Sequence, residues 1–258
     1  METLLAQHIP MLEKMQKYPE KLFYKGNIDL LARPKVSIVG TRNPSIYTQD
    51  FTYMLAKALA KRGVCVVSGG AMGVDALAHH GAGAENTIAV LGNGIDIYYP
   101  ALNRELLKNI ERKGLILSQF ENGFKATNWS FVVRNELVVA LGDILIVTEA
   151  AIDSGSMRSV EYALKMGKEI FVLPQRLNES LGTNSLLKQG QAKAIEEIES
   201  FVSRFGEVAK DETVRDAFFY FCQSTPTLDE SIKKFGDRVY EAELEGIITI
   251  QNGIVRLA

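Results

Sequence analysis

Cysteine and histidine are scarce in this sequence of 258 residues, which contains two cysteines and three histidines. Two cysteines cannot build a disulfide framework, and Cys65 and Cys222 both lie in apolar runs, so we expect buried free thiols. The histidines have no cysteine or carboxylate partners at the spacings of metal sites. We therefore predict neither a metal site nor a cofactor.

Long hydrophobic runs are also missing. No stretch approaches the roughly 20 apolar residues that a membrane-spanning helix requires. The N-terminus does not have the charged and then apolar layout of a signal peptide. The sequence therefore predicts a globular cytoplasmic protein without a membrane partner.

Excess charge of one sign is absent as well. The formal net charge is −2, and no long segment is basic overall. A nucleic-acid site in this chain would therefore be a local cluster of cations and not a broad basic surface.

Several motifs of enzymes and nucleotide-binding proteins are missing. The chain has no P-loop and no G-x-S-x-G nucleophile elbow. A strand-like run at 36–39 reaches Gly40 but continues with Thr41 and Arg42, where the dinucleotide-binding fingerprint would require further glycines. The common nucleotide-binding signatures are thereby excluded, and the ligand of this first turn stays open.

Strand-like and helix-like segments alternate from residue 35 onward. This alternation predicts an α/β fold, a doubly wound and mainly parallel sheet with helices on both faces, between residues 34 and 203. The expected strands are 36–39, 64–67, 87–91, 115–117, 144–147 and 170–173. The expected helices are 51–59, 73–83, 103–112, 131–141, 157–166 and 184–203.

The C-terminal segment has a different pattern. Its expected elements are helices at 213–222, 227–235 and 237–245 and a hairpin around Asn252 and Gly253. Three short helices followed by a hairpin describe a winged-helix domain, which we place at 213–258 after a linker at 204–212. Residues 1–33 are expected to form an N-terminal extension that packs on the core.

Three turns that follow predicted strands could bind an anion, because ligands of an open α/β sheet lie at the carboxyl ends of its strands. The first contains Arg42, and the second is the glycine-rich segment 68–73, which opens a helix. The third, 154–156, places two serines and a glycine at another helix start. Glycines and free helix-start amides can approach a phosphate closely. Tyr98 and Tyr99, after a further turn, are expected to have a packing role.

The segment 124–135 combines aromatic rings with cations. Trp129 and Phe131 lie between Lys125 and Arg134. Aromatic rings can stack on bases while cations follow the phosphate backbone, which is how single strands are held without sequence reading. Burial of both rings in the core, with solvated cations, is the alternative that this pattern leaves open.

Taken in order, the motifs of this chain resemble those of the DprA family, also called Smf, the DNA-processing proteins of natural transformation. The resemblance extends over nearly the whole chain. The matching segments are YPEKLFYKGN, SIVGTRNPSIY, SGGAMGVDALAH, TIAVLGNGIDIYYP, LILSQF, FVVRNELVVALGDILIV, SGSMRSVEYALKMGKEIFVLP and ELEGIITIQNGIVRL.

The resemblance implies an extended Rossmann-like domain that forms a homodimer and binds single-stranded DNA in a positively charged pocket. It also implies that the protein protects incoming single-stranded DNA and, without catalysis, loads the RecA recombinase in place of single-strand-binding protein. Arg42 would then reach a phosphodiester with a long bidentate cation. The DNA-binding residues that the resemblance implies are Gly40, Thr41, Arg42, Ser68, Gly69, Gly70, Gly73, Lys125, Ser130, Phe131, Arg134, Asn135, Ser154, Gly155 and Ser156.

The sequence departs from the family pattern at several positions. Val132 and Glu136 stand where the family usually has a proline and an arginine, and Gln119 replaces a common glutamate. Arg158 occupies a position that is usually apolar. The basic residue often found just before the phenylalanine is missing, and we assign its charge to Lys125.

Two other functions stay open at this point. Nucleotide phosphoribohydrolases of the lysine-decarboxylase-like type share the layout, but their P-G-G-x-G-T-x-x-E motif is replaced at 153–161 by a segment without the glycine pair and with a displaced glutamate. A winged-helix regulator would need a cationic third helix to read duplex DNA. Because the segment 237–246 has four acidic residues and one arginine, we expect this domain to contact protein or to be structural.

Overall fold

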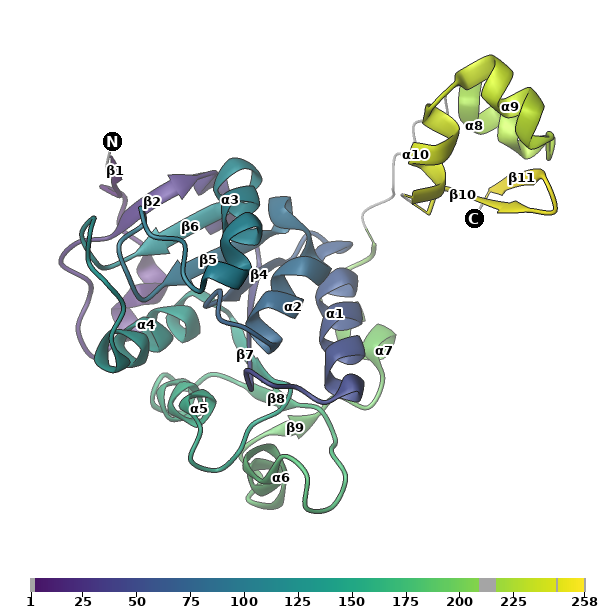
Figure 1. Cartoon of the computed structure of the whole chain (residues 1–258). Coiled ribbons are helices and arrows are strands. Elements are labelled where there is room, and N and C mark those ends of the chain that lie inside the picture. Colours follow the sequence, from purple (N-terminus) through teal and green to yellow (C-terminus); the bar gives the residue numbers. More distant parts are fainter. Residues whose placement is uncertain (1–2, 209–216, 245, 258) are drawn as a thin grey trace. The chain divides into compact units, whose positions relative to one another are not determined.

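The chain divides into two units between residues 209 and 210. The computed structural model in Figure 1 describes residues 3–208, 217–244 and 246–257. The division falls inside the predicted linker, of which residues 209–212 lie outside the described residues. The beginning of the first predicted C-terminal helix, 213–216, also lies outside them.

A mainly parallel sheet forms the centre of the larger unit. Its strands are β1 (Thr3–Leu4), β2 (Phe23–Gly26), β3 (Lys35–Val39), β4 (Cys65–Ser68), β5 (Thr87–Leu91), β6 (Leu115–Ser118), β7 (Ile144–Val147), β8 (Ile170–Val172) and β9 (Lys193–Ala194). Among the described residues, the order of neighbours is β1, β2, β6, β5, β4, β3, β7, β8, β9. All pairs from β6 to β9 are parallel, whereas β1, β2 and β6 pair antiparallel. The α/β fold predicted from the alternating pattern is thus confirmed.

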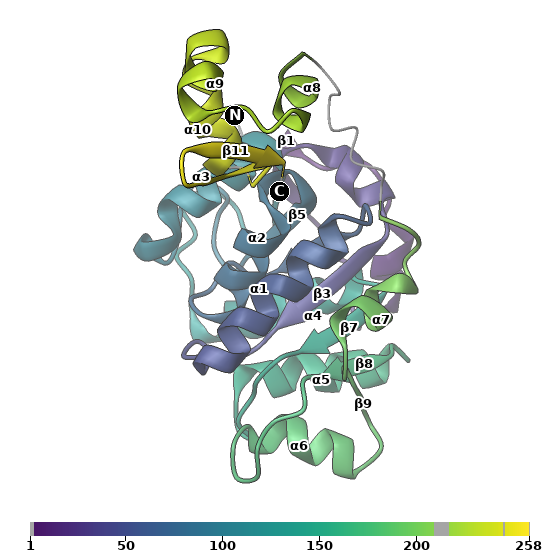
Figure 2. The same cartoon turned by 90° about the vertical axis from the view of Figure 1, so that its right-hand side faces the viewer.

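Helices cover both faces of this sheet, as Figure 1 shows. Their bounds are α1 (Ile46–Ala60), α2 (Val74–Ala82), α3 (Arg104–Lys113), α4 (Asn128–Leu141), α5 (Gly155–Lys165), α6 (Leu181–Lys188) and α7 (Ile198–Ser203). The helices α1, α2, α3 and α7 pack on one face, and α4, α5 and α6 pack on the other. Figure 2 shows α1 and α7 in front of the strands β3 and β7.

Successive residues of each central strand enter the cores on opposite faces of the sheet. In β7, Leu145 and Val147 pack with α4 and α5, whereas Ile144 and Ile146 pack with α1 and α2. Both faces therefore need apolar side chains, which is why these strands read as continuous runs of Val, Ile and Leu.

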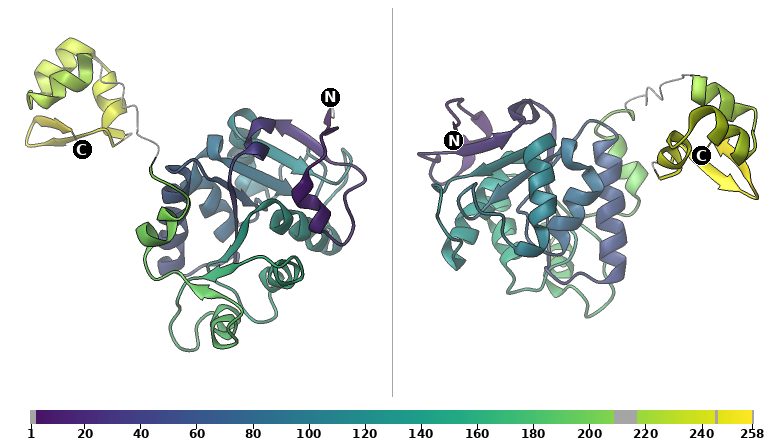
Figure 3. Two further views of the ribbon diagram at one scale, coloured as in Figure 1. Left: turned by 180° about the vertical axis from the view of Figure 1, so that it is seen from behind. Right: turned by 45° about the horizontal axis from the view of Figure 1, so that its top comes forward.

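The N-terminal segment is part of the sheet. The strand β2 pairs antiparallel with β6, and Phe23 lies opposite Ser118. Leu12, in a short 3-10 helix (Pro10–Lys14), is fully buried in the core that contains α4. Figure 3 shows this segment from behind, in purple, beside the sheet.

The predicted single helix at 184–203 is wrong. The segment instead forms α6, the strand β9 and α7. Gly190 follows α6 with a φ of +67°, a conformation that ends helices. β9 then pairs with β8, and Ile195 is buried beside the sheet edge. The apolar residues of this segment pack in three separate elements, which their spacing alone does not reveal.

The smaller unit contains three helices followed by a two-stranded antiparallel sheet among its described residues. The elements are α8 (Ala217–Gln223), α9 (Leu228–Phe235), α10 (Arg238–Leu244), β10 (Ile248–Gln251) and β11 (Ile254–Leu257). Asn252 and Gly253 both have positive φ, as a tight hairpin turn requires. The core of this unit contains Phe218, Val239 and Val255.

Candidate functional site

Two adjoining hollows open beyond the carboxyl ends of β3, β4 and β7. The chain places β4 on one side of β3 and β7 on the other, and such a reversal of strand order is where open α/β sheets hold ligands. The tyrosine-side hollow is lined by Arg42, Gly69, Ala71, Met72, Leu91, Gly92, Asn93, Tyr99, Pro100, Phe131 and Arg134. The serine-side hollow is lined by Val39, Gly40, Thr41, Arg42, Gly69, Ala71, Asp75, Asn128, Phe131, Val132, Arg134, Asn135, Val138, Ser154, Gly155, Ser156 and Ser159.

The first turn packs directly against the glycine-rich turn. The amide of Val74 donates to the carbonyl of Thr41 at 3.1 Å. Gly73 has a φ of +74°, and a Cβ at this position would lie 2.5 Å from the carbonyl oxygens of both Thr41 and Arg42. A Cβ on Gly40 would lie 2.6 Å from the side chain of Val74. Both glycines are therefore needed to bring Arg42 next to the glycine-rich turn.

Asp75 holds the glycine-rich turn from inside. Its Oδ2 accepts hydrogen bonds from the amides of Gly69 at 3.1 Å and Ala71 at 3.3 Å. Burial raises the pKa of Asp75, and the largest opposing influence is the charge of Arg134. The Gly69 amide, which we expected to face a phosphate, thus already has a partner inside the protein.

Arg134 enters the site from α4 and is 5% exposed. Its Nη1 donates to the carbonyl of Val90 at 2.9 Å and lies 4.0 Å from Oδ2 of Asp75. A Cβ on Gly69 would lie 1.5 Å from the same nitrogen. Burial lowers the pKa of Arg134 and Asp75 opposes this change, and an arginine stays protonated in any case. Arg134 therefore connects α4 to the end of β5 by a hydrogen bond and packs against the glycine-rich turn.

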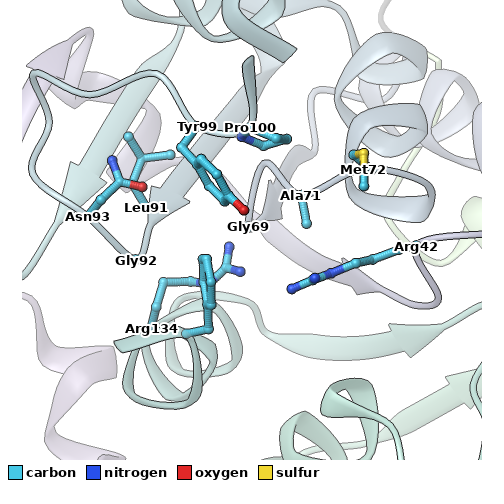
Figure 4. A pocket seen from close by; sticks show the side chains of 11 residues that line it. Arg42, Gly69, Ala71, Met72, Leu91, Gly92, Asn93, Tyr99, Pro100 and Arg134 are labelled. Carbon is cyan, nitrogen blue, oxygen red and sulfur yellow. The ribbon is translucent and has the colours of Figure 1, made fainter. Parts of the chain in front are cut away.

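Arg42 and Arg134 flank the ring of Phe131. Their Cζ atoms lie 5.7 Å and 5.8 Å from the ring centroid, within the range of cation–π contacts. The ring of Tyr99 lies 6.1 Å from that of Phe131, and Tyr99 is half exposed. Figure 4 shows Arg42 and Arg134 reaching toward the same space, with Tyr99 beside them. Guanidinium groups and aromatic faces, the groups suited to phosphates and bases, are therefore combined here.

The start of α5 borders the serine-side hollow. Ser154 is the N-cap, and Gly155 and Ser156 are the first helical residues. The hydroxyl oxygens of Ser154 and Ser159 are buried and have no hydrogen-bond partner in the part of the chain that the structure describes. The side-chain amide of Asn135 donates to the carbonyl of Gly155 at 3.4 Å and links α4 to this turn. Free helix-start amides and unpaired hydroxyls are suitable donors to an anion.

The structure brings most of the predicted site residues together. Those that line a hollow are Gly40, Thr41, Arg42, Gly69, Phe131, Arg134, Asn135, Ser154, Gly155 and Ser156. Those that line neither hollow are Ser68, Gly70, Gly73, Lys125 and Ser130.

Two of the remaining residues have internal partners. The buried hydroxyl of Ser68 donates to the carbonyl of Ile38 at 2.7 Å. Ser130 completes the capping box of α4, where its Oγ accepts from the amide of Thr127 at 2.8 Å. Lys125 is exposed in the loop before α4 and does not line either hollow. Ser68 is thus held by a contact with a strand 30 residues away in the chain, whereas Ser130 is held by a local helix cap.

Asp75, Tyr99 and Ser159 were missed as site residues. Asp75 had a signal, since an acidic residue in the first turn of a helix can accept from the amides of the glycine-rich turn before it. Ser159 lies one helical turn after Gly155, on the same face of α5. Tyr98 packs against the core as expected, but Tyr99 lines a hollow, which corrects its predicted packing role.

Within residues 3–208, 217–244 and 246–257, no group of three or more His, Cys, Asp or Glu side chains is arranged to hold a metal ion. None of the helices described there is both long and apolar enough to span a bilayer. Cys65 and Cys222 are both buried and do not form a disulfide, as predicted.

Known proteins share this architecture. The family model described as DNA recombination-mediator protein A matches residues 4–206. DNA processing protein A from Helicobacter pylori, solved to study its single-stranded DNA binding mode, is 43% identical with a TM-score of 0.77, over 79% of this chain and 94% of that chain. DprA from Streptococcus pneumoniae is 32% identical with a TM-score of 0.73, over 80% and 75% of the two chains. Protein Smf from Synechocystis is 36% identical over 188 residues, 70% of this chain and 47% of that protein.

The chain spans 47% and 64% of the curated relatives from Synechocystis and Streptococcus pneumoniae, which is less than two thirds of their length. The family match covers most of this chain and includes every residue that lines the two hollows. The resemblance found in the sequence motifs is therefore confirmed, and the chain belongs to the DNA recombination-mediator protein A family.

Proposed function

We propose that the chain binds single-stranded DNA in the two hollows, protects it, and loads the RecA recombinase onto it during natural transformation. The main observation behind the proposal is that Arg42, Phe131 and the start of α5 meet where the strand order reverses, beyond the carboxyl ends of β3 and β7. The related protein from Helicobacter pylori is described as binding single-stranded DNA.

The lining residues favour an unpaired strand over a duplex. Arg42 is exposed and can contact a phosphate, and the amides at the start of α5 can contact a second one. Phe131 and Tyr99 present aromatic rings on which a base can stack. A base can reach these rings only when it is not already paired and stacked in a double helix.

The proposed role involves binding without catalysis. Among the described residues that line the hollows, Asp75 is the one carboxyl group, and it is occupied by the amides of Gly69 and Ala71. The alternative, a nucleotide phosphoribohydrolase, would need a glutamate at the ribose. Glu161 is exposed on α5 and pairs with Arg158 at 3.0 Å instead. Release of a base from nucleoside monophosphates by the purified protein would favour the alternative.

Family membership supports further proposals about partners. We propose a homodimer formed through the larger unit, and contacts with RecA and with single-strand-binding protein during loading. We also propose that residues 213–258 are a winged-helix domain that contacts protein and not DNA. Within it, α10 carries Glu241 and Glu243 against Arg238, a balance that disfavours phosphate binding.

The test measures binding of a fluorescent dT oligonucleotide and of a matched duplex over a range of salt concentrations. Binding should favour the single strand and weaken as salt rises. Arg42→Ala should weaken it about 10- to 150-fold, because a hydrogen bond to a charged group contributes about 1.5–3 kcal/mol.

Arg112→Ala is the matched control, since Arg112 is exposed on α3 and does not line either hollow. It removes the same charge from the chain and should leave the affinity nearly unchanged. Equal losses in the two variants, or equal affinity for duplex and single strand, would contradict the proposed site.

A further inference from the structure

Few charged residues line the two hollows. In the described part of the chain they are Arg42, Asp75 and Arg134. Arg42 is exposed, whereas Asp75 and Arg134 are buried. Their formal charges leave one positive charge in the site, although two arginines line it.

One oxygen of Asp75 faces three donors. Its Oδ2 lies 3.1 Å from the Gly69 amide, 3.3 Å from the Ala71 amide and 4.0 Å from Nη1 of Arg134. All three groups can only donate, so they suit an ionised carboxylate. In anion-binding loops the amides of a glycine-rich turn point at a bound phosphate. Here the carboxylate of Asp75 takes the place of that phosphate.

One nitrogen of Arg134 is likewise bonded within the protein, whereas its Nε is buried and has no hydrogen-bond partner among the described residues. Its Nη1 donates to the carbonyl of Val90 and fills the space that a side chain at Gly69 would need. Because the pair with Asp75 is buried, water and salt screen it far less than they screen Arg42. A strand in the hollows would therefore meet Arg134 together with its neutralising carboxylate.

On the basis of the proposed function, we propose that Asp75 is a positioning residue that neutralises Arg134 inside the site. The Asp75–Arg134 pair holds the glycine-rich turn and the floor of the hollows in place. Arg42 then supplies the net positive charge that a phosphate experiences. Arg134 contributes shape and packing to the site and is not a phosphate ligand.

The test compares salt dependences of dT oligonucleotide binding by the full chain. The logarithm of the affinity falls with the logarithm of salt concentration by about 0.7 for each phosphate neutralised on a single strand. Arg42→Gln should therefore make the slope shallower by about 0.7. Asp75→Asn keeps the shape but frees the charge of Arg134, so it should make the slope steeper by about 0.7.

The double variant Asp75→Asn/Arg134→Gln shows whether Arg134 contacts a phosphate, because it removes the pair without changing the net charge. It should return to the wild-type slope. A slope shallower by the same amount as in Arg42→Gln would overturn the proposal, since Arg134 would then contact a phosphate. An unchanged slope in a folded Asp75→Asn variant would overturn it as well.

A purely structural role of Asp75 would lower affinity or unfolding free energy without making the slope steeper. If a single variant fails to fold by circular dichroism, the double variant carries the test, since it leaves no buried charge unpaired. Wild-type protein that does not bind the oligonucleotide would refute the proposed function and this inference together. If the wild-type protein binds the oligonucleotide and Arg42→Gln makes the salt slope shallower, the proposed function stands. A double variant whose slope is also shallower than that of the wild type would then refute only the inference about Asp75.

Discussion

Gly73→Ala should separate the two turns that build the site. Gly73 has φ +74° and ψ −127°, a region that residues with a side chain occupy at a cost of about 1–3 kcal/mol. The new Cβ would also lie 2.5 Å from the carbonyl oxygens of Thr41 and Arg42, where ordinary contact begins at 3.4 Å. Because both oxygens belong to the backbone, the turns must move, which adds about 1–3 kcal/mol of overpacking. We expect a total loss of about 2–6 kcal/mol of unfolding free energy.

Gly63→Ala is the matched control for this change. Gly63 has a φ of +75°, but a Cβ there would meet no atom within 4 Å. It should lose only the backbone contribution of about 1–2 kcal/mol and keep its affinity for DNA. Urea unfolding followed by the fluorescence of Trp129, the only tryptophan of the chain, gives the free energies, and dT oligonucleotide binding gives the affinities. Equal stability losses together with wild-type binding in Gly73→Ala would refute the reasoning.

Two further predictions concern buried groups that titrate. His79 donates from Nδ1 to Thr87, whose own hydroxyl donates to Val66, and burial lowers the pKa of His79 to about 3. As the pH falls from 6.5 to about 3, only the unfolded chain takes up a proton at this position. The free energy of unfolding should therefore decrease with falling pH, by up to about 1.4 kcal/mol per pH unit. In His79→Asn, the free energy of unfolding measured in urea should decrease less steeply with falling pH than in the wild type. The same pH dependence in both proteins would contradict the role given to His79. Burial also lowers the pKa of Lys168 to about 8, below its ordinary 10.5. The unfolded chain then holds the extra proton between these values, so stability should rise with pH across this window relative to Lys168→Met; parallel curves would exclude Lys168 as the cause.

The central sheet could be predicted because its strands are buried on both faces. A run such as Ile144–Val147 needs apolar residues at every position, and no helix period describes it. The strand β2 was missed because its alternation is weak, with Phe23 buried and Tyr24 half-buried in a strand of four residues. The prediction of a single helix at 184–203 failed because its buried residues are in separate places: Leu186 lies in α6, Ile195 directly after β9, and Val202 in α7.

The position of the site could also be predicted, but not the orientation of its polar side chains. Turns at the carboxyl ends of parallel strands meet at one edge, so Arg42 and the start of α5 were expected to be close. The burial of Arg134 depends on Val90, which lies 44 residues earlier in the chain, and on Asp75. Such partners come together only after the sheet has formed, and a motif read along the chain does not contain them.

Both margins of the nine-stranded sheet end in strands of two residues, β1 on one side and β9 on the other, among the described residues. Strands this short offer few open backbone groups, and Lys193 places a charge on the β9 margin. Joining of two copies by strand addition is therefore disfavoured at the β9 margin. A partner that approaches this margin would meet a charged side chain before it met open backbone groups.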